Sequence, residues 1–193
     1  MTCQFLFFDT ETTGLPRNWR APMTQLDNWP RMVQLAWMVC DDLGAEWASA
    51  SRIIRPDGYS IPADASRIHG ITTQKACAEG IPLADALAEI LPHLATADFI
   101  VAHNISFDEN ILGSECLRMG LPNPFAGKSL RCTMRESTEF CGIPGHYGLK
   151  FPTLTELHRL LFNTAFDGAH DALADVRACK ACFYELRRRR VLA

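Results

Sequence analysis

The sequence predicts an α/β fold, in which a mixed β-sheet is flanked by α-helices. Two patterns predict it. Short apolar runs of strand length occupy the opening third of the chain, and apolar residues with helical spacing alternate with further short runs after it. The resulting order, βββ-α-β-α-β-α, is typical of helices packed on a sheet. The 193 residues fit one domain, 1–193.

The opening third predicts an antiparallel meander of three strands. Residues 4–8 form a continuous apolar, aromatic-rich run that is typical of a buried central strand. Residues 16–31 contain three prolines and no sustained period, so we expect a loop. Residues 32–40 and 46–55 then predict two further strands, joined by a turn at 41–44.

The rest of the chain predicts helices that alternate with short strands. Helical spacing begins after Pro62, and one helix starts near Pro82 and extends to Leu94. The further expected elements are a strand at 99–102, a helix at 107–119, a strand at 129–134, a short helix at 136–141, a glycine-proline loop at 142–152, and helices at 154–162 and 171–188.

The composition is that of an average soluble domain, with 48% apolar residues and a formal net charge of −3. It excludes a disordered tail or a fibre, and it argues mildly against nucleic-acid binding because no global basic field exists. Acidic side chains dominate up to residue 110 and basic ones beyond it. We expect the eight cysteines to be reduced, mostly buried thiols. No basic leader or membrane-length apolar stretch is present, so we expect a cytoplasmic protein without membrane contact.

Acidic side chains follow two of the predicted strands. Asp9 and Glu11 are two residues apart, so a strand would point both to one face. Two desolvated charges there favour a divalent cation, although two solvated acids at a strand end are the plainer alternative. Asp108 follows the strand at 99–102 and would open the next helix, a position that the helix dipole alone also favours.

A third acidic position lies at the start of the final helix. Asp171 is a plausible N-cap, and Asp175 falls in the first helical turn, with His170 just before the helix. A lone histidine there is more often structural than catalytic. Capping explains Asp171 without any catalytic role.

Residues 8–15, 102–108 and 170–175 resemble, in order, the three motifs of the DEDDh (DnaQ-like) 3′–5′ exonuclease superfamily. That superfamily includes the epsilon subunit of bacterial DNA polymerase III, ribonuclease T and the TREX nucleases. Residues 68–72 resemble a further epsilon-like signature, and the resemblance covers roughly residues 5–186. It implies a ribonuclease H-like fold with a five-stranded mixed sheet.

The resemblance also implies functional roles. Asp9, Glu11, Asp108 and Asp175 would hold two Mg²⁺ ions, with Mn²⁺ able to substitute, and His170 would be the general base. This is chemically reasonable, because hard cations prefer oxygen ligands and histidine titrates near neutral pH.

The implied substrate contacts lie in the same motifs. In the first motif, Thr10 and Thr12 would contact the 3′-terminal nucleotide and Leu15 would wedge against its base, while His69 and Phe107 would line the pocket. The plainer alternatives are that Leu15 and Phe107 belong to the core and that His69 caps a turn.

We therefore expect a metal-dependent enzyme that removes nucleoside 5′-monophosphates from the 3′ end of single-stranded DNA. One alternative is an exoribonuclease acting on short RNA or tRNA ends, since contacts to a 2′-hydroxyl are not visible in the sequence. Another is a non-catalytic module that holds a 3′ end or a DNA polymerase. The complete set of acids and histidine argues against the non-catalytic reading, and the oligomeric state is open.

Other features are weaker signals. Cys179 and Cys182 predict buried core thiols rather than a zinc site. The basic run 187–190 could contact phosphate or complement a helix dipole. The loop 16–29, with Trp19, Trp29 and two arginines, could border the substrate path or be pinned to the core by its tryptophans. Gln34 stands where relatives commonly have an acid.

Overall fold

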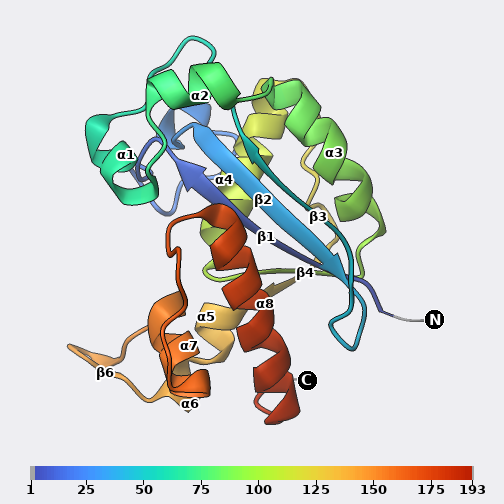
Figure 1. The fold of residues 1–193 in the computed structure, drawn as a ribbon, viewed down its shortest axis with the longest axis vertical. Coiled ribbons are helices and arrows are strands. Elements are labelled where there is room, and N and C mark those ends of the chain that lie inside the picture. Colours follow the sequence, from blue (N-terminus) through green and yellow to red (C-terminus); the bar gives the residue numbers. More distant parts are fainter. Residues whose placement is uncertain (1–2, 193) are drawn as a thin grey trace.

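A five-stranded mixed sheet forms the centre of the fold, as Figure 1 shows for this computed structural model, which describes residues 3–192. The strand order is β3-β2-β1-β4-β5. β1 pairs antiparallel with β2 and parallel with β4, and this confirms the predicted fold class. The strands are β1 (Phe5–Thr12), β2 (Met32–Cys40), β3 (Glu46–Ile53), β4 (Phe99–Ala102) and β5 (Ser129–Cys132).

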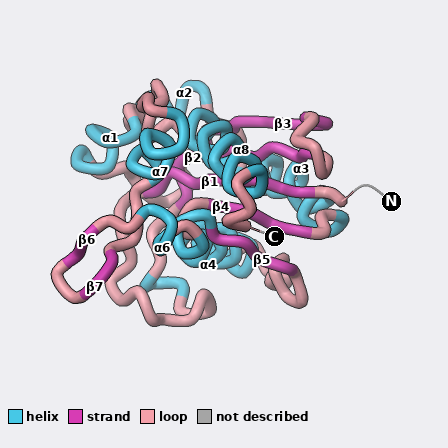
Figure 2. The backbone as a smooth tube through the Cα atoms, turned by 90° about the horizontal axis from the view of Figure 1, so that it is seen from below, coloured by secondary structure: helices cyan, strands magenta, loops and turns pink. Residues whose placement is uncertain are grey.

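Helices pack on both faces of the sheet, because alternate side chains of β1 are buried in two different clusters. Leu6 and Phe8 join the core formed with α3 (Leu83–Thr96) and α4 (Ile105–Arg118). Phe5 and Phe7 join the core formed with α7 (Leu154–Phe162) and α8 (Ala172–Arg188). Figure 2 shows the helices in cyan around the magenta strands.

The helical region after Pro62 divides into more helices than the spacing alone predicts. α1 (Ala63–His69) ends at Gly70, whose φ of 73° is left-handed, and α2 (Thr73–Glu79) follows before α3. Both short helices pack around Val33 of β2. The register of β1 against β2 shifts opposite Val33, and a bulge of this kind turns a strand locally.

The segment after β5 differs from the prediction in its boundaries. The strand expected over 129–134 ends at Cys132, because α5 (Thr133–Glu136) begins there and Glu136 accepts a hydrogen bond from the Cys132 N–H (2.7 Å). The helix expected over 136–141 is therefore divided between α5 and α6 (Thr138–Cys141). The predicted loop 142–152 contains a small hairpin of β6 (Pro144–Gly145) and β7 (Gly148–Leu149).

Two further sequence expectations can be compared with the fold. All eight cysteines are unpaired thiols, as expected, and Cys77 is the exposed one. Within residues 3–192, no helix has the length and apolar character needed to cross a membrane.

Candidate active site

Asp9 and Glu11 lie near the end of β1, as the sequence predicted, although the apolar run that indicated the strand ends at Phe8. β1 continues to Thr12 because β2 still pairs with it there, Asp9 opposite Ala36 and Glu11 opposite Gln34. The pairing with β4 has already stopped at Phe7. The two carboxylates therefore extend past the neighbouring strand, on the face of β1 that packs against α8.

The other two acids approach from the first turns of two helices. Asp108, only 3% exposed, lies in the first turn of α4. Its Oδ1 accepts hydrogen bonds from the Thr10 N–H (3.0 Å) and the Thr10 hydroxyl (2.7 Å). Asp175 lies in the first turn of α8, and its Oδ2 accepts from the His170 N–H (3.1 Å). The predicted placement of both acids at helix N-termini is confirmed.

His170 has left-handed backbone geometry, with a φ of 71°. This conformation is unfavourable for a residue with a Cβ, and such strain concentrates at functional sites. One potential ligand atom from each of His170, Glu11 and Asp175 lies within 4.8 Å of the other two. The backbone geometry and the Asp175 hydrogen bond thus hold the imidazole next to the acidic cluster.

The four carboxylates repel one another strongly. Burial, and then repulsion by Asp108 and Asp175, raises the pKa of Asp9 well above its ordinary range. Burial is also the largest cause that raises the pKa of Glu11 to about 8, of Asp108 to about 7 and of Asp175 to about 6. Within the described part of the chain, none of the four forms an ion pair with lysine or arginine. The cluster therefore needs protons or a bound cation to be stable.

This donor set fits hard divalent cations. Carboxylate oxygens are the ligands that Mg²⁺ and Mn²⁺ prefer, and four carboxylates balance the charge of two dications. Asp171 is not one of these four carboxylates. It caps α8 by accepting a hydrogen bond from the Ala174 N–H (3.1 Å), which confirms its predicted role. It also accepts from the side-chain amide of Gln34 (3.2 Å).

A largely apolar cavity of about 580 Å³ adjoins the carboxylates. All five residues predicted to bind substrate line it, together with Glu11, His170 and the α1 residue Ile68, whose role the sequence did not indicate. Its lining comprises Thr10–Leu15, Pro62, Asp64, Ala65, Ile68, His69, Phe107 and His170. The predicted pocket residues are therefore neighbours in space, and Leu15 is 72% exposed rather than part of the core.

Three of these pocket residues also have partners within the protein. The Thr10 hydroxyl binds Asp108, and the Thr12 hydroxyl donates to the Gly14 carbonyl (2.7 Å). The Nδ1 atom of His69 accepts from the Ile71 N–H (3.1 Å), so His69 supports the turn after α1 while it lines the cavity. Burial lowers the pKa of His69, which keeps its ring neutral.

Gln34 connects β2 to the start of α8. Its Oε1 accepts from the Ala172 N–H (3.2 Å), and its Nε2 donates to Asp171 (3.2 Å) and to the Ser51 hydroxyl (3.0 Å). A polar side chain within a strand that is buried throughout was the only signal of this role in the sequence. Gln34 thus fixes the helix end that carries Asp175.

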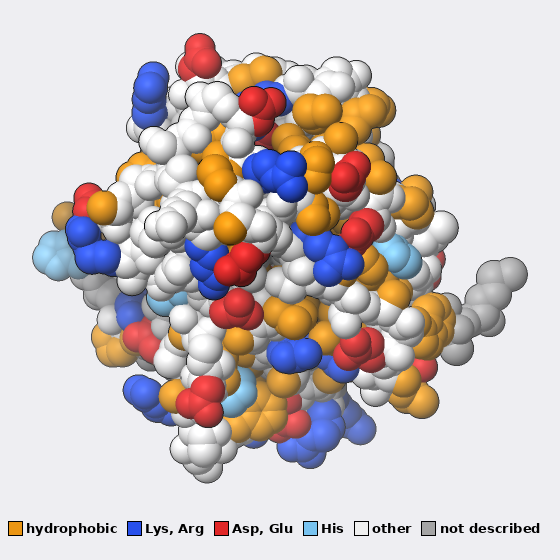
Figure 3. Space-filling view, turned by 45° about the horizontal axis from the view of Figure 1, so that its top comes forward, with side chains coloured by type: hydrophobic (Ala, Val, Ile, Leu, Met, Phe, Trp, Pro, Cys, Tyr) orange, Lys and Arg blue, Asp and Glu red, His pale blue; other side chains and the backbone are white. Residues whose placement is uncertain are grey.

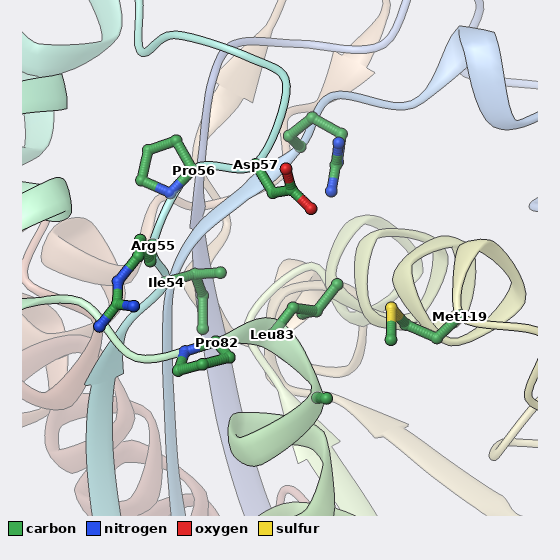
Figure 4. Close-up of a pocket in the computed structure, with 9 residues that line it drawn as sticks. Ile54, Arg55, Pro56, Asp57, Pro82, Leu83 and Met119 are labelled. Atoms are coloured by element: carbon green, nitrogen blue, oxygen red, sulfur yellow. The ribbon is translucent and has the colours of Figure 1, made fainter.

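A second cavity, of about 350 Å³, is drawn in Figure 4. Residues 54–57, Pro82, Leu83 and Met119 are among those that line it. Arg31, which also borders it, donates to the buried Glu115 (2.9 Å). This cavity lacks a carboxylate cluster, and within residues 3–192 the side chains arranged to hold a metal are those of the first site.

The weaker sequence signals have structural explanations. Cys179 and Cys182 are buried in the core against the sheet, as predicted. In the basic run, Arg187 pairs with Asp42, while Arg188 and Arg189 pair with Glu185. Figure 3 shows basic and acidic side chains interspersed over one face, without a broad area of one sign.

The sheet order and the acids converging on its central strand together define a nuclease. Residues 6–183 match the family model described as "Exonuclease" (RNase_T). The chain belongs to this exonuclease family, and it is a 3′–5′ exonuclease of the DnaQ-like DEDDh superfamily. The resemblance deduced from the three motifs is confirmed.

Two relatives are similar over most of this chain. An uncharacterized exonuclease, CP81, of Escherichia phage 186 is 28% identical over 186 residues, which cover 89% of this chain and 82% of that protein. The 3′–5′ exonuclease DinG of Bacillus subtilis is 28% identical over 185 residues, which cover 95% of this chain but only 17% of DinG.

Among solved structures, exonuclease I has the same fold. E. coli exonuclease I in complex with a dT13 oligonucleotide has a TM-score of 0.75 at 24% identity, over 98% of this chain. Exonuclease I of Methylocaldum szegediense has a TM-score of 0.73 at 24% identity, over 97% of this chain. The chain spans about two fifths of the length of these proteins, 42% and 41% respectively.

Proposed function

We propose that the protein hydrolyses phosphodiester bonds at the 3′ end of single-stranded DNA and releases nucleoside 5′-monophosphates. The convergence of Asp9, Glu11, Asp108 and Asp175 beside His170 and an apolar cavity carries this proposal. The solved complexes of E. coli exonuclease I contain dT13 and dA16, and these support single-stranded DNA as the substrate class.

The four carboxylates would hold two Mg²⁺ ions, with Mn²⁺ able to substitute. A zinc-bound form of the E. coli exonuclease I complex supports a divalent-cation site in this fold. Bound there, the cations would lower the pKa of a water and stabilise the negative charge that develops on the leaving 3′-oxygen. The carboxylates would position these ions, and Thr10 fixes Asp108 through its two hydrogen bonds.

His170 would act as the general base. A ring nitrogen takes a proton from the attacking water as the new P–O bond forms; the bond between phosphorus and the 3′-oxygen breaks, and the 3′-oxygen takes up a proton. The imidazole is close to Glu11 and Asp175, so the base would lie beside carboxylates that hold the cations. Its position on a loop before α8 gives it access to the open side of the cluster.

The cavity would hold the terminal nucleotide. Phe107 offers an aromatic face on which any base can stack, so recognition there tolerates different sequences. Leu15 is exposed at the cavity and would wedge between the terminal base and the next one. This arrangement requires an unpaired 3′ end.

The proposal is tested by cleavage of 5′-labelled single-stranded DNA, duplex DNA and RNA, with Mg²⁺, Mn²⁺ or EDTA. We expect metal-dependent release of nucleoside 5′-monophosphates, fastest from single-stranded DNA. Asp9→Asn removes one charge from the cluster and should abolish cleavage. Asp85→Asn, at an exposed position on α3, is the matched control and should retain it.

The outcomes separate the alternatives. Faster cleavage of RNA would change the substrate to RNA and leave the chemistry in place. Absence of cleavage of all three substrates would exclude the catalytic proposal. Equal activity of Asp9→Asn and the wild type would show that the carboxylate cluster is not the catalytic site.

A further inference from the structure

The loop between β1 and β2 is rigidly attached to the protein. At its base, the Thr13 N–H donates to the Arg31 carbonyl (2.9 Å), and the Arg31 N–H donates to the Thr13 hydroxyl (3.0 Å). Further along, the Asn18 N–H donates to the Asn28 side chain (2.8 Å), which in turn donates to the Asn18 carbonyl (3.0 Å). Asn28 is 5% exposed, so these bonds are shielded from water.

A second set of contacts fixes the loop to α4. The Ser114 hydroxyl donates to the Met23 carbonyl (3.0 Å). The Arg118 guanidinium donates to the carbonyls of Leu26 (2.6 Å) and Trp29 (2.8 Å). The Trp29 ring is buried at 4% exposure. The loop is thus pinned to the core, as one of the two sequence interpretations expected, but by Trp29 and not by Trp19.

Trp19 behaves differently from Trp29 although both belong to the same loop. It is 54% exposed, an unusual position for so large an apolar ring. Its ring centroid lies 5.7 Å from that of Phe107, with the two planes tilted by 41°. Phe107 lines the substrate cavity and Trp19 does not, so Trp19 extends the aromatic surface of Phe107 outside the cavity.

Two basic residues flank Trp19 in the sequence of the loop. Arg17 and Arg20 are both exposed. Within the described residues, neither guanidinium has an acidic or other polar partner. An exposed aromatic ring beside unpaired positive charges is the combination that binds single-stranded nucleic acid, by stacking bases and by contacting phosphates.

We infer that Trp19, with Arg17 and Arg20, forms a second nucleotide subsite that stacks the base preceding the 3′-terminal nucleotide. The inference rests on the proposed function, because it assumes that the terminal nucleotide occupies the cavity beside Phe107. The pinned loop holds the ring in place before substrate arrives, so little conformational entropy is lost on binding. The subsite contacts the face of a base and a phosphate, which every nucleotide has, so its affinity should not depend on the identity of the base.

Equilibrium binding tests the inference separately from catalysis. The affinities of wild type, Trp19→Ala and Trp19→Phe are measured by fluorescence anisotropy for a 5′-labelled dT10 oligonucleotide, with Ca²⁺ replacing Mg²⁺. We expect Trp19→Ala to weaken binding roughly 5- to 150-fold, the range for loss of one stacked base, and Trp19→Phe to recover most of it. Trp47→Ala is the matched control, since Trp47 is 53% exposed but lies on β3 near the opposite end of the sheet.

The position of the subsite is tested with a dT10 that has an abasic residue next to its 3′ end. This substrate should bind the wild type more weakly, and Trp19→Ala should cause no further loss. Binding of thymidine 5′-monophosphate, measured by calorimetry, should be the same for both proteins.

Each outcome decides a specific point. Equal affinities of wild type and Trp19→Ala for dT10, or an equal loss on the abasic oligonucleotide, would overturn the inference whether or not the enzyme cleaves DNA. Trp19-dependent binding without cleavage in Mg²⁺ would support the subsite and overturn the proposed function.

Discussion

The acidic cluster makes the metal-free protein sensitive to pH, and Glu11 is the group through which this is most directly tested. Its pKa is raised from the ordinary 4.5 to about 8, mainly by burial. A raised carboxyl pKa means that the folded state binds a proton more tightly than the unfolded state does. The protonated Glu11 carboxyl therefore adds to the free energy of unfolding. This contribution is full below about pH 4.5 and is lost as pH rises through about 8.

The magnitude follows from the same two pKa values. Each pKa unit corresponds to about 1.4 kcal/mol, so the rise from 4.5 to about 8 sets a ceiling of about 5 kcal/mol. Partial access of solvent to the carboxylate raises the effective dielectric constant and reduces this to roughly 2 kcal/mol. In a domain of this size, such a loss lowers Tm by roughly 4–8 °C.

The assay is thermal unfolding, monitored by circular dichroism, of protein in EDTA between pH 5 and pH 8. We expect the Tm of the wild type to fall over this range and Mg²⁺ to restore it at pH 8. Glu11→Gln carries no ionisable group at this position, so at pH 8 in EDTA it should unfold roughly 4–8 °C above the wild type. It should also lack activity and gain little from Mg²⁺.

Glu79→Gln, at an exposed position on α2, is the control for a general effect of removing one charge, and its Tm should follow that of the wild type. The reasoning would be refuted if Glu11→Gln were less stable than the wild type at pH 8 in EDTA, or if the wild-type Tm did not depend on pH.

Three further substitutions test the supports of the site. Thr10→Val removes the hydroxyl that donates to Asp108 (2.7 Å). The free energy of unfolding in urea should fall by about 1–3 kcal/mol, and kcat should also fall. Unchanged stability and kcat would contradict this. Gln34→Leu removes the acceptor of the Ala172 N–H and should lower kcat with little change in KM, which steady-state kinetics measures; an effect on KM alone would place Gln34 in substrate binding. Glu115, 1% exposed, pairs with Arg31 (2.9 Å) at the base of the β1–β2 loop and with Arg118 (3.2 Å). Glu115→Gln removes this buried charge and should lower the free energy of unfolding in urea at neutral pH by roughly 3–5 kcal/mol. A loss below about 1 kcal/mol would show that the two arginines are solvated.

The sequence predicted the order of the main elements because their apolar periodicity is local. The apolar run that predicted β1 ends at Phe8, but the strand continues to Thr12, since the polar residues 9–12 are held in it by pairing with β2. The sequence also predicted too few helices in the region of α1 and α2, for a related reason. Helical spacing continues past Gly70, and the left-handed turn there becomes evident only in three dimensions.

For the candidate site, too, some residues could be predicted from the sequence and others could not. The four acids and His170 could be predicted because they lie within short motifs with a defined order. Gln34 could not be assigned a role, because its bond to Asp171 joins residues 137 positions apart. The two tryptophans of the β1–β2 loop also have similar local sequence contexts. Only the contacts of the loop with α4 determine that Trp29 is buried and Trp19 is exposed.

The two hydrogen bonds between Thr13 and Arg31 close the base of the β1–β2 loop where it leaves the sheet. Because these bonds form beside the paired strands, a change at the exposed part of the loop, such as Trp19, leaves the register of β1 against β2 in place. Binding of the DNA strand can therefore be altered without changing the chemistry at Asp9 and Glu11. Substitutions at Arg17, Trp19 and Arg20, which leave Asn28 and Trp29 in place, become a way to alter DNA binding while keeping a single catalytic framework.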